Sequence, residues 1–358
     1  ITALLLLFTL SVTSLLACTS ADKPESATGK TSKTSKSIND KKTDLIPVTL
    51  NEVAHSIFYA PMYVAMEKNY FEKEGIDLSL VTGFGADKTM TAVLSGTADI
   101  GFMGSEASIY TYNEGARDYV VNFAQLTQRA GNFLVAREDI KNFKWEDLKG
   151  RKVIGGRKGG MPEMVFEYIL KQNHIDPASD LTIDQNIDFG STAAAFAEEK
   201  ADYDFTVEFE PGATNLEKQE KGYVVASLGT DSGYVPYTAF SAKKSYISQH
   251  PEIIQGFTNA LQKGMNYVAS HTPEEIAQVI APQFKETTPD TITTIVSRYY
   301  EQDTWKKDLI FRQESFDLLQ DILEDAGELK KRAPYKNLVT TIYAEKSAKT
   351  VKDTTISH

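Results

Sequence analysis

The sequence has very little cysteine: among its 358 residues, Cys18 is the only one. A single cysteine cannot form an internal disulfide, and it cannot supply the thiolates of a cysteine-based zinc site. The five histidines are dispersed along the chain, and the catalytic patterns H-E-x-x-H and G-x-S-x-G are absent. We therefore expect no enzyme activity and no cofactor.

Positive charge is also scarce. The chain has 38 Lys and Arg residues against 49 Asp and Glu residues, a formal net charge of −11. A general nucleic-acid binder needs a basic face to engage phosphates, so this balance argues against nucleic acid as a partner, although it leaves room for a local basic patch. The hydrophobic content of 41% and the charged content of 24% are ordinary for a folded soluble protein. The length suffices for two domains or for one large two-lobed unit.

The first 17 residues carry no charge and end in the sequence L-L-A-C at positions 15–18. A membrane anchor is one interpretation, but about 17 residues lie at the low edge for a transmembrane helix. The segment passes directly into a polar stretch, as an export leader does. L-L-A-C resembles the cleavage box of bacterial lipoproteins. That resemblance implies a signal peptide at 1–17 and lipidation of Cys18, which becomes the first residue of the mature protein.

Both ends of the chain are predicted to be loose. Residues 20–44 are rich in Ser, Thr and Lys without apolar periodicity, so we expect a flexible tether over 18–46. Residues 344–358 are polar and are expected to form a loose tail. A lipid, a tether and a folded body together indicate an extracytoplasmic protein anchored to the bacterial cell membrane.

Between residues 47 and 343 the apolar pattern changes repeatedly from strand to helix. Strands are predicted at 48–53, 76–80, 98–103, 119–125, 132–136, 152–154, 181–186, 205–207, 223–227 and 238–242. Alternating β and α elements predict an α/β fold with mainly parallel sheets covered by helices. We expect two lobes, 47–137 plus 236–343 and 138–235, with crossings at 137–145 and 232–237. A ligand would then bind between the lobes.

Several segments of the body resemble one known family. They are SIFYAPMYVA (56–65), YFEKEGIDL (70–78), LSGTADIGFMGSEA (94–107), DLKGRKVI (147–154), VPYTAF (235–240) and APYKNLV (333–339). They are similar to solute-binding proteins of nitrate/sulfonate/taurine-type ABC importers, a superfamily that also contains binders of pyrimidine precursors of thiamine. The resemblance implies a type II periplasmic-binding-protein fold with two hinge strands. It also implies a monomer that delivers its solute to a permease driven by a cytoplasmic ATPase.

The loop after the first strand contains four candidate ligand contacts: His55, Ser56, Phe58 and Tyr59. In the resembled family this loop contacts the ligand, and open α/β sheets hold ligands at the carboxyl ends of their strands. His55 could equally be an exposed loop residue. Phe58 and Tyr59 could pack in the core, but we expect one of them to face the cleft, where a flat ring can stack on a planar solute.

The loop after the third predicted strand contributes Gly104, Ser105 and Glu106. It opens a helix, whose N-terminal N–H groups favour an anion. Ser105 is expected either to cap this helix or to offer its hydroxyl to the cleft. Glu106 would stabilise an ordinary helix start, but in a cleft it would repel an anionic ligand.

Two further segments supply Gln128, Arg129, Gly160 and Met161. Arg129 could clamp a sulfonate or carboxylate with two hydrogen bonds, or it could pair with a nearby carboxylate of the protein. The loop 155–160 is rich in glycine but lacks the phosphate-binding patterns G-x-G-x-x-G and G-x-x-x-x-G-K-[ST]. We expect its backbone to approach the ligand beside Gly160, with Met161 either close to the ligand or packed in the core.

Glu208 and Glu210 flank Phe209 near the predicted strand at 205–207. Strand alternation predicts that the two carboxylates share one side and that Phe209 lies opposite. In the resembled family this position is a contact of the second lobe. Two carboxylates there would suit an amine-bearing solute or a metal ion, although a solvated loop edge is the alternative.

The predicted function is a receptor that captures a small organic solute, sulfonate-like or aminopyrimidine-like, and releases it unaltered to a permease. Glu106, Glu208 and Glu210 favour a nitrogenous or zwitterionic solute, whereas Arg129 and the helix starts favour an anion. One alternative is a receptor for a divalent metal ion, with His55 and nearby carboxylates as ligands. Another is an enzyme like the pyrimidine synthases that share the fold, but their Cys-rich motif is absent here.

Overall fold

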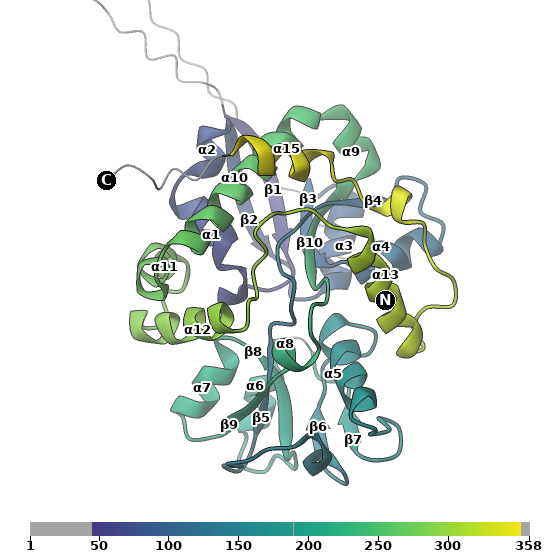
Figure 1. Ribbon diagram of the computed structural model, residues 1–358, viewed down its shortest axis with the longest axis vertical. Helices are drawn as coiled ribbons and strands as arrows, with labels where there is room; N and C mark the ends of the chain where they lie inside the picture. The colour runs from purple at the N-terminus through teal and green to yellow at the C-terminus, as the bar shows by residue number, and fades with distance from the viewer. Residues whose placement is uncertain (1–44, 189, 352–358) are drawn as a thin grey trace, which may run out of the picture. The chain divides into compact units, whose positions relative to one another are not determined.

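The structure is a computed structural model that describes residues 45–188 and 190–351 (Figure 1). The predicted signal peptide, the lipidation site at Cys18 and nearly all of the tether lie outside the described residues, as do residues 352–358. Two five-stranded sheets organise the described body.

The first sheet has the strand order β2-β1-β3-β10-β4. Its strands are β1 (Ile46–Glu52), β2 (Ile76–Thr82), β3 (Ile100–Gly104), β4 (Val120–Gln125) and β10 (Thr238–Lys243). Strand β1 pairs in parallel with β2 and β3, whereas β10 pairs antiparallel with β3 and β4. Four strands therefore run in one direction and β10 runs in the other.

The second sheet repeats this arrangement with the order β7-β6-β8-β5-β9. Its strands are β5 (Asn132–Ala136), β6 (Lys152–Ile154), β7 (Thr182–Asp184), β8 (Phe205–Phe209) and β9 (Tyr223–Ser227). Strand β6 is parallel to β7 and β8, and β5 is antiparallel to β8 and β9. The predicted α/β class with mainly parallel sheets is confirmed.

The two reversed strands are the ones that follow a crossing between the sheets. The chain leaves the first sheet after β4 and enters the second at β5, so the first crossing is 126–131. The predicted crossing at 137–145, which left β5 in the first lobe, is wrong. Because every residue of β5 is buried, its apolar sequence suits the interior of either sheet and does not reveal which one it joins. The second crossing lies between α8 (Leu228–Asp231) and β10, at the predicted position.

The helices next to the first sheet include α1 (Ala60–Glu67), α2 (Tyr70–Lys73), α3 (Ala86–Ser95), α4 (Glu106–Asn113) and α9 (Lys244–Gln249). The long helix α10 (Pro251–Ser270) lies against α1 (Figure 1). A Cβ on Gly264 of α10 would lie 2.1 Å from the carbonyl oxygen of Pro61, so only glycine permits this close approach. Thr272 forms a capping box with Glu275: its hydroxyl accepts from the N–H of Glu275 at 3.3 Å.

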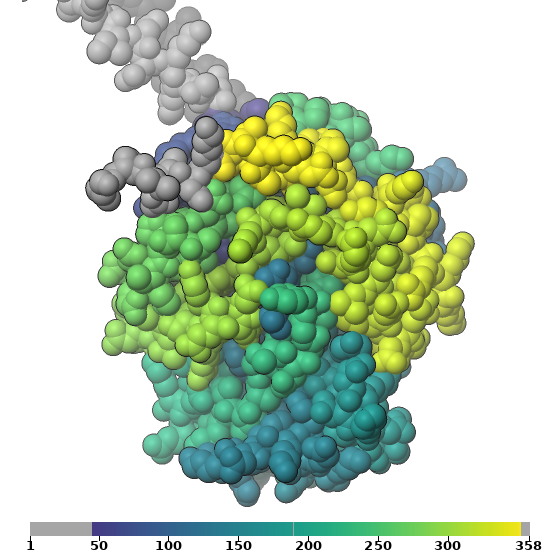
Figure 2. Space-filling model, in the orientation of Figure 1, coloured from purple at the N-terminus to yellow at the C-terminus, as the bar shows by residue number. Residues whose placement is uncertain are grey.

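The remaining C-terminal helices are α11 (Pro273–Ile280), α12 (Pro289–Glu301), α13 (Gln313–Asp325), α14 (Tyr335–Leu338) and α15 (Ile342–Thr350). The second sheet is accompanied by α5 (Met161–Gln172), α6 (Thr192–Ala197) and α7 (Gly212–Lys218). Helix α13 packs on both α4 and α5, and the space-filling view shows the yellow-green C-terminal region against the teal residues around α5 (Figure 2). The C-terminal helices therefore contact elements of both sheets.

The predicted loose tail is wrong for residues 344–350, because α15 is an ordered helix that packs on α10. Ala344 and Ser347 are buried there, and the hydroxyl of Ser347 donates to Asn259 Oδ1 at 2.7 Å. The polar composition of this segment obscures a narrow buried face of Tyr343, Ala344 and Ser347. Among the described residues, none of the helices combines the length and the apolar character that a membrane crossing requires.

Candidate functional site

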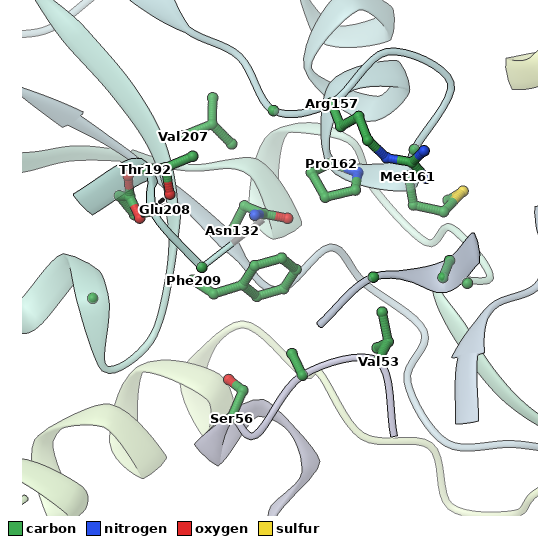
Figure 3. A pocket seen from close by; sticks show the side chains of 18 of the residues that line it. Val53, Ser56, Asn132, Arg157, Met161, Pro162, Thr192, Val207, Glu208 and Phe209 are labelled. Atoms are coloured by element: carbon green, nitrogen blue, oxygen red, sulfur yellow. Dashed lines mark hydrogen bonds between the residues drawn. The ribbon is translucent and has the colours of Figure 1, made fainter. Parts of the chain in front are cut away.

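A cavity of about 290 Å³ lies between the two sheets. Loops at the carboxyl ends of β1, β2, β3, β6, β7 and β8 contribute to its wall, as do the first residues of β5 and β10. Figure 3 shows Thr192 beside Glu208 on one part of the wall and Arg157 with Met161 and Pro162 on another. The cavity is thus built at the strand ends where open α/β sheets hold ligands.

Most of the predicted contact residues line this cavity. They are His55, Ser56, Tyr59, Gly104, Glu106, Gly160, Met161, Glu208 and Glu210. Phe58, Ser105, Gln128 and Arg129 do not line it. The structure brings the first group together at one site, and their contact with a ligand stays a prediction.

His55 lines the cavity but uses both of its ring nitrogens within the protein. Nδ1 lies 2.8 Å from a carboxylate oxygen of the buried Glu52, and Nε2 lies 2.9 Å from the backbone oxygen of Gln283. Burial lowers the pKa of His55, but the hydrogen bonds with Glu52 and Gln283 outweigh it and the pKa is raised. Two acceptors facing the ring suit an imidazolium, which has no lone pair for a metal.

The metal-receptor alternative therefore loses His55, the histidine of its expected ligand set. Within residues 45–188 and 190–351, no group of three or more His, Cys, Asp and Glu side chains could hold a metal ion.

Of the two neighbouring aromatic residues, Tyr59 lines the cavity and Phe58 does not. Phe58 is fully buried, and its ring packs against Tyr237 and Tyr299. A Cβ on Gly131, in the first crossing, would lie 2.7 Å from the Phe58 ring. The prediction of Phe58 as a ligand contact is wrong: it packs beneath the crossing between the sheets.

Glu106, at the first position of α4, is the most unusual ionisable group of the site. Its side chain is only 2% exposed, and its Oε2 atom has no hydrogen-bond partner in the described structure. A Cβ on Gly104 would lie 2.1 Å from that atom, so the carboxyl folds back over the glycine at the end of β3. Burial raises the pKa of Glu106 to about 7, although backbone N–H groups and Arg157 oppose the rise.

Ser105 precedes Glu106 but does not line the cavity. Its hydroxyl is buried without a partner and makes no capping hydrogen bond to α4. Both predicted roles of this side chain, a helix cap and a cleft contact, are wrong. Its backbone has α-helical φ and ψ, unlike the extended conformation usual for a capping residue.

Glu208 lies near the end of β8 and is held by two hydroxyls. Thr192 donates to Oε2 at 2.9 Å, and Thr206 donates to Oε1 at 2.6 Å. Burial raises the pKa of Glu208 to about 7; the two threonines oppose this rise and Glu210 adds to it. Phe209 also lines the cavity, which contradicts the predicted strand alternation, because β8 ends at Phe209.

Glu210 has a charge partner of its own. Its carboxylate accepts from Arg298 of α12 at 2.8 Å and from the backbone N–H and the hydroxyl of Thr214, both at 2.9 Å. Its backbone oxygen accepts from the hydroxyl of Ser56 at 2.6 Å. Glu210 therefore links the second sheet to the first-sheet loop and to α12.

Gln128 and Arg129 serve the first crossing rather than the cavity. Arg129 donates to the backbone oxygen of Gly229 at 2.9 Å, and its guanidinium lies 4.1 Å from the centre of the Tyr234 ring. Gln128 donates to the backbone oxygen of Asp303 at 3.0 Å. Neither side chain lines the cavity, so both predicted ligand contacts are wrong. Their hydrogen-bond partners lie 100 and 175 positions away in the sequence.

Several lining residues escaped the sequence prediction, among them Phe84, Asn132, Arg157 and Tyr237. Arg157 belongs to the glycine-rich loop 155–160, and its guanidinium lies 3.3 Å from Asp87 beyond β2. The glycine loop itself was a usable signal for Arg157. Asn132 is the first residue of β5 and Tyr237 directly precedes β10, so they are identified only once the crossings are located.

Two sheets with one reversed strand each, two crossings and a cavity between them define a type II periplasmic-binding-protein fold. Solved structures with this fold are similar over most of the chain. The ligand-binding component of an ABC-type import system from Staphylococcus aureus, with zinc bound, has a TM-score of 0.67 at 15% identity and covers 84% of this chain and 98% of that one. The alkanesulfonate-binding protein from Xanthomonas axonopodis pv. citri, bound to MOPS, has a TM-score of 0.67 at 14% identity, covering 82% and 98%.

The chain belongs to the NMT1/THI5-like family, whose model matches residues 57–276. The binding protein YtlA of Bacillus subtilis (strain 168) is 47% identical over 302 residues, covering 84% of this chain and 90% of the relative. This relative is named a binding protein rather than an enzyme, in agreement with the expectation from the sequence.

Proposed function

We propose that this protein is the extracytoplasmic receptor of an ABC importer, which captures a small organic solute between its two sheets and delivers it unaltered to a permease. The observation that carries the proposal is the cavity of about 290 Å³ at the strand ends of both sheets. Its volume is close to the lower end for ligand sites, which suits a metabolite. The importer components in the names of the structural neighbours support the same function.

The remaining features of the proposal come from the sequence. L-L-A-C at residues 15–18 supports a lipid on Cys18 and anchoring outside the cytoplasm. We expect a monomer, since a receptor of this kind presents both lobes to its permease.

The charges of the cavity favour a nitrogenous solute over a sulfonate. Arg129, the residue proposed to clamp an anion, does not line the cavity, whereas Glu106 and Glu208 do. The sulfonate and the zinc of the two structural neighbours are properties of those proteins. Both ring nitrogens of His55 are occupied within the protein, and Arg157, the arginine of the described cavity wall, is paired with Asp87.

A binding screen tests the receptor function. The purified chain is heated with taurine, alkanesulfonates, nitrate and aminopyrimidines, and we expect one class to raise the melting temperature because a ligand stabilises the folded form by mass action. Calorimetry with the best compound should give one site per chain, and the compound should be recovered chemically unchanged. Turnover of the bound compound would contradict the proposal. So would normal uptake of that compound in a strain that lacks the gene.

A further inference from the structure

Two carboxyl groups of the cavity, Glu106 and Glu208, have no ion-pair partner among the described residues, although the charge of Arg157 acts on Glu106 from beyond ion-pair distance. Of the ionisable residues that line it, His55, Arg157 and Glu210 each have an oppositely charged partner. Across the described part of the chain, no Lys, Arg or His lies within ion-pair distance of Glu106 or Glu208. Because these two residues belong to α4 and β8, each sheet unit contributes one of these carboxyls.

At Glu106, a buried carboxyl group has one oxygen that accepts no hydrogen bond from the described residues. The residue is only 2% exposed, and its Oε2 atom accepts no hydrogen bond in the described structure. The absence of a side chain at Gly104 leaves the space into which this carboxyl folds. A buried polar atom without a partner is costly, and one that borders a cavity can be satisfied by what enters the cavity.

Glu208 retains acceptor capacity as well. Each of its oxygens accepts one hydroxyl, from Thr192 or Thr206, and a carboxylate oxygen can accept more than one hydrogen bond. A Cβ on Gly212 would approach Oε2 to 3.3 Å, so this glycine also keeps room beside the carboxyl. Hydroxyl donors are neutral, and they orient Glu208 without cancelling its charge.

Burial destabilises the ionised states of Glu106 and Glu208, so each carboxylate carries a desolvation penalty. The raised pKa values of Glu106 and Glu208, each about 7, have burial as their main cause. A positively charged group in the cavity would reverse both penalties. The rest of the wall includes the aromatic rings of Tyr59, Phe209 and Tyr237, which suit an apolar or planar body.

We propose that the cleft selects a solute with a positively charged nitrogen group, a protonated amine or an amidinium, on an apolar or aromatic body, and that Glu106 and Glu208 accept its N–H groups. This inference rests on the receptor function proposed above. It makes the charge of the solute the opposite of a sulfonate's or a nitrate's. It also gives the solute a role in bringing together the two sheet units, since its charge stabilises a carboxylate from each.

The test uses the full chain and four probes that share one ring: benzylamine and benzamidine as cations, benzyl alcohol as a neutral compound, and benzenesulfonate as an anion. Calorimetry in mildly alkaline buffer keeps both carboxyls ionised and the two cationic probes protonated. We expect a cationic probe to bind about tenfold or more tightly than the neutral and anionic probes. Glu106→Gln and Glu208→Gln should each weaken that binding by about tenfold or more.

Glu114→Gln is the matched control, because Glu114 follows α4 and is exposed, so the change removes one negative charge outside the cavity. We expect its binding of the cationic probes to equal that of the wild type. Glu106→Gln should also raise the melting temperature of the ligand-free protein, because it removes a buried charge without a partner. A variant that is more stable yet binds cations less tightly cannot be explained by misfolding.

The inference is overturned if benzenesulfonate or benzyl alcohol binds as tightly as the cations, if no cationic probe binds, or if the two variants bind them like the wild type. Tight binding of benzenesulfonate would leave the receptor function intact and reverse only the charge of its solute. The receptor function fails separately, through turnover of the solute or through unchanged uptake in the deletion strain.

Discussion

The carboxyl of Glu208 borders the cavity between the hydroxyls of Thr192 and Thr206, whereas the guanidinium of Arg129 is occupied by the backbone oxygen of Gly229 and the ring of Tyr234. These two side chains would serve opposite classes of solute. Substituting each of them in turn therefore compares, residue by residue, a solute bound by a carboxylate with one bound by a guanidinium.

Glu208→Gln should weaken binding of the natural solute about 10- to 100-fold, since a hydrogen bond to a charged group is lost. Arg129→Gln should change the affinity less than about twofold, because Arg129 lies off the cavity. Titration calorimetry with the compound found in the screen measures both. The reverse ranking would restore the sulfonate interpretation.

The His55–Glu52 contact predicts a dependence of stability on pH. The pKa of His55 is raised above its ordinary 6.5 in the folded protein, so its protonation stabilises the fold fully below about pH 6.5. This contribution is lost as the pH rises through the folded-state pKa. Urea unfolding of the wild type and of His55→Gln should therefore give a difference in free energy that shrinks as the pH is raised above 6.5.

His271→Gln provides the control, because His271 is hydrogen-bonded to Tyr267 and Ser270 and does not line the cavity. Its difference from the wild type should not follow the same curve. A difference for His55→Gln that grows with pH would show that the imidazole is neutral at the site.

At the scale of elements, Arg298 connects α12 to two carboxylates that belong to the second sheet and to α7. It lies 2.8 Å from Glu210 and 2.7 Å from Glu217. The carboxylate of Glu210 is fully buried. Arg298→Ala should cost about 3 kcal/mol in the free energy of unfolding, because it leaves that buried charge without its partner.

Arg312→Ala is a matched comparison. Arg312 pairs with Asp308 at 2.7 Å, four positions away, and its side chain is 48% exposed. A pair as exposed as this contributes about 1 kcal/mol or less. Equal costs for the two variants in urea unfolding would show that Glu210 is stabilised chiefly by Thr214 instead.

The elements themselves were predictable to a large extent. The alternation of apolar residues along a strand is a local feature, and the structure has a strand at each position predicted from it. The sheet that β5 joins was not predictable, since a short, buried and mainly apolar strand does not reveal which strands it will pair with. Helix α15 was missed because its buried face is narrow, with Tyr343, Ala344 and Ser347 within a polar sequence.

For the whole molecule we expect no bound metal. Elemental analysis of the purified chain after dialysis should find zinc and other divalent metals well below one per chain, because both nitrogens of His55 are occupied by Glu52 and Gln283. Removal of trace metal with a chelator should leave the melting temperature unchanged. One equivalent of zinc that survives dialysis would revive the metal-receptor alternative.

By itself, the sequence determined the two-lobed α/β class, the family and most of the strand-end loops that line the cavity. These depend on local periodicity and on short motifs, which a single chain displays directly. Only the tertiary structure decided that Phe58, Ser105, Gln128 and Arg129 lie off the cavity, and that Glu106 and Glu208, among the described residues, border it without an ion-pair partner. Those outcomes depend on contacts with groups far away in the sequence, such as Gly229 for Arg129 and Asp303 for Gln128. Local sequence patterns do not predict such long-range contacts.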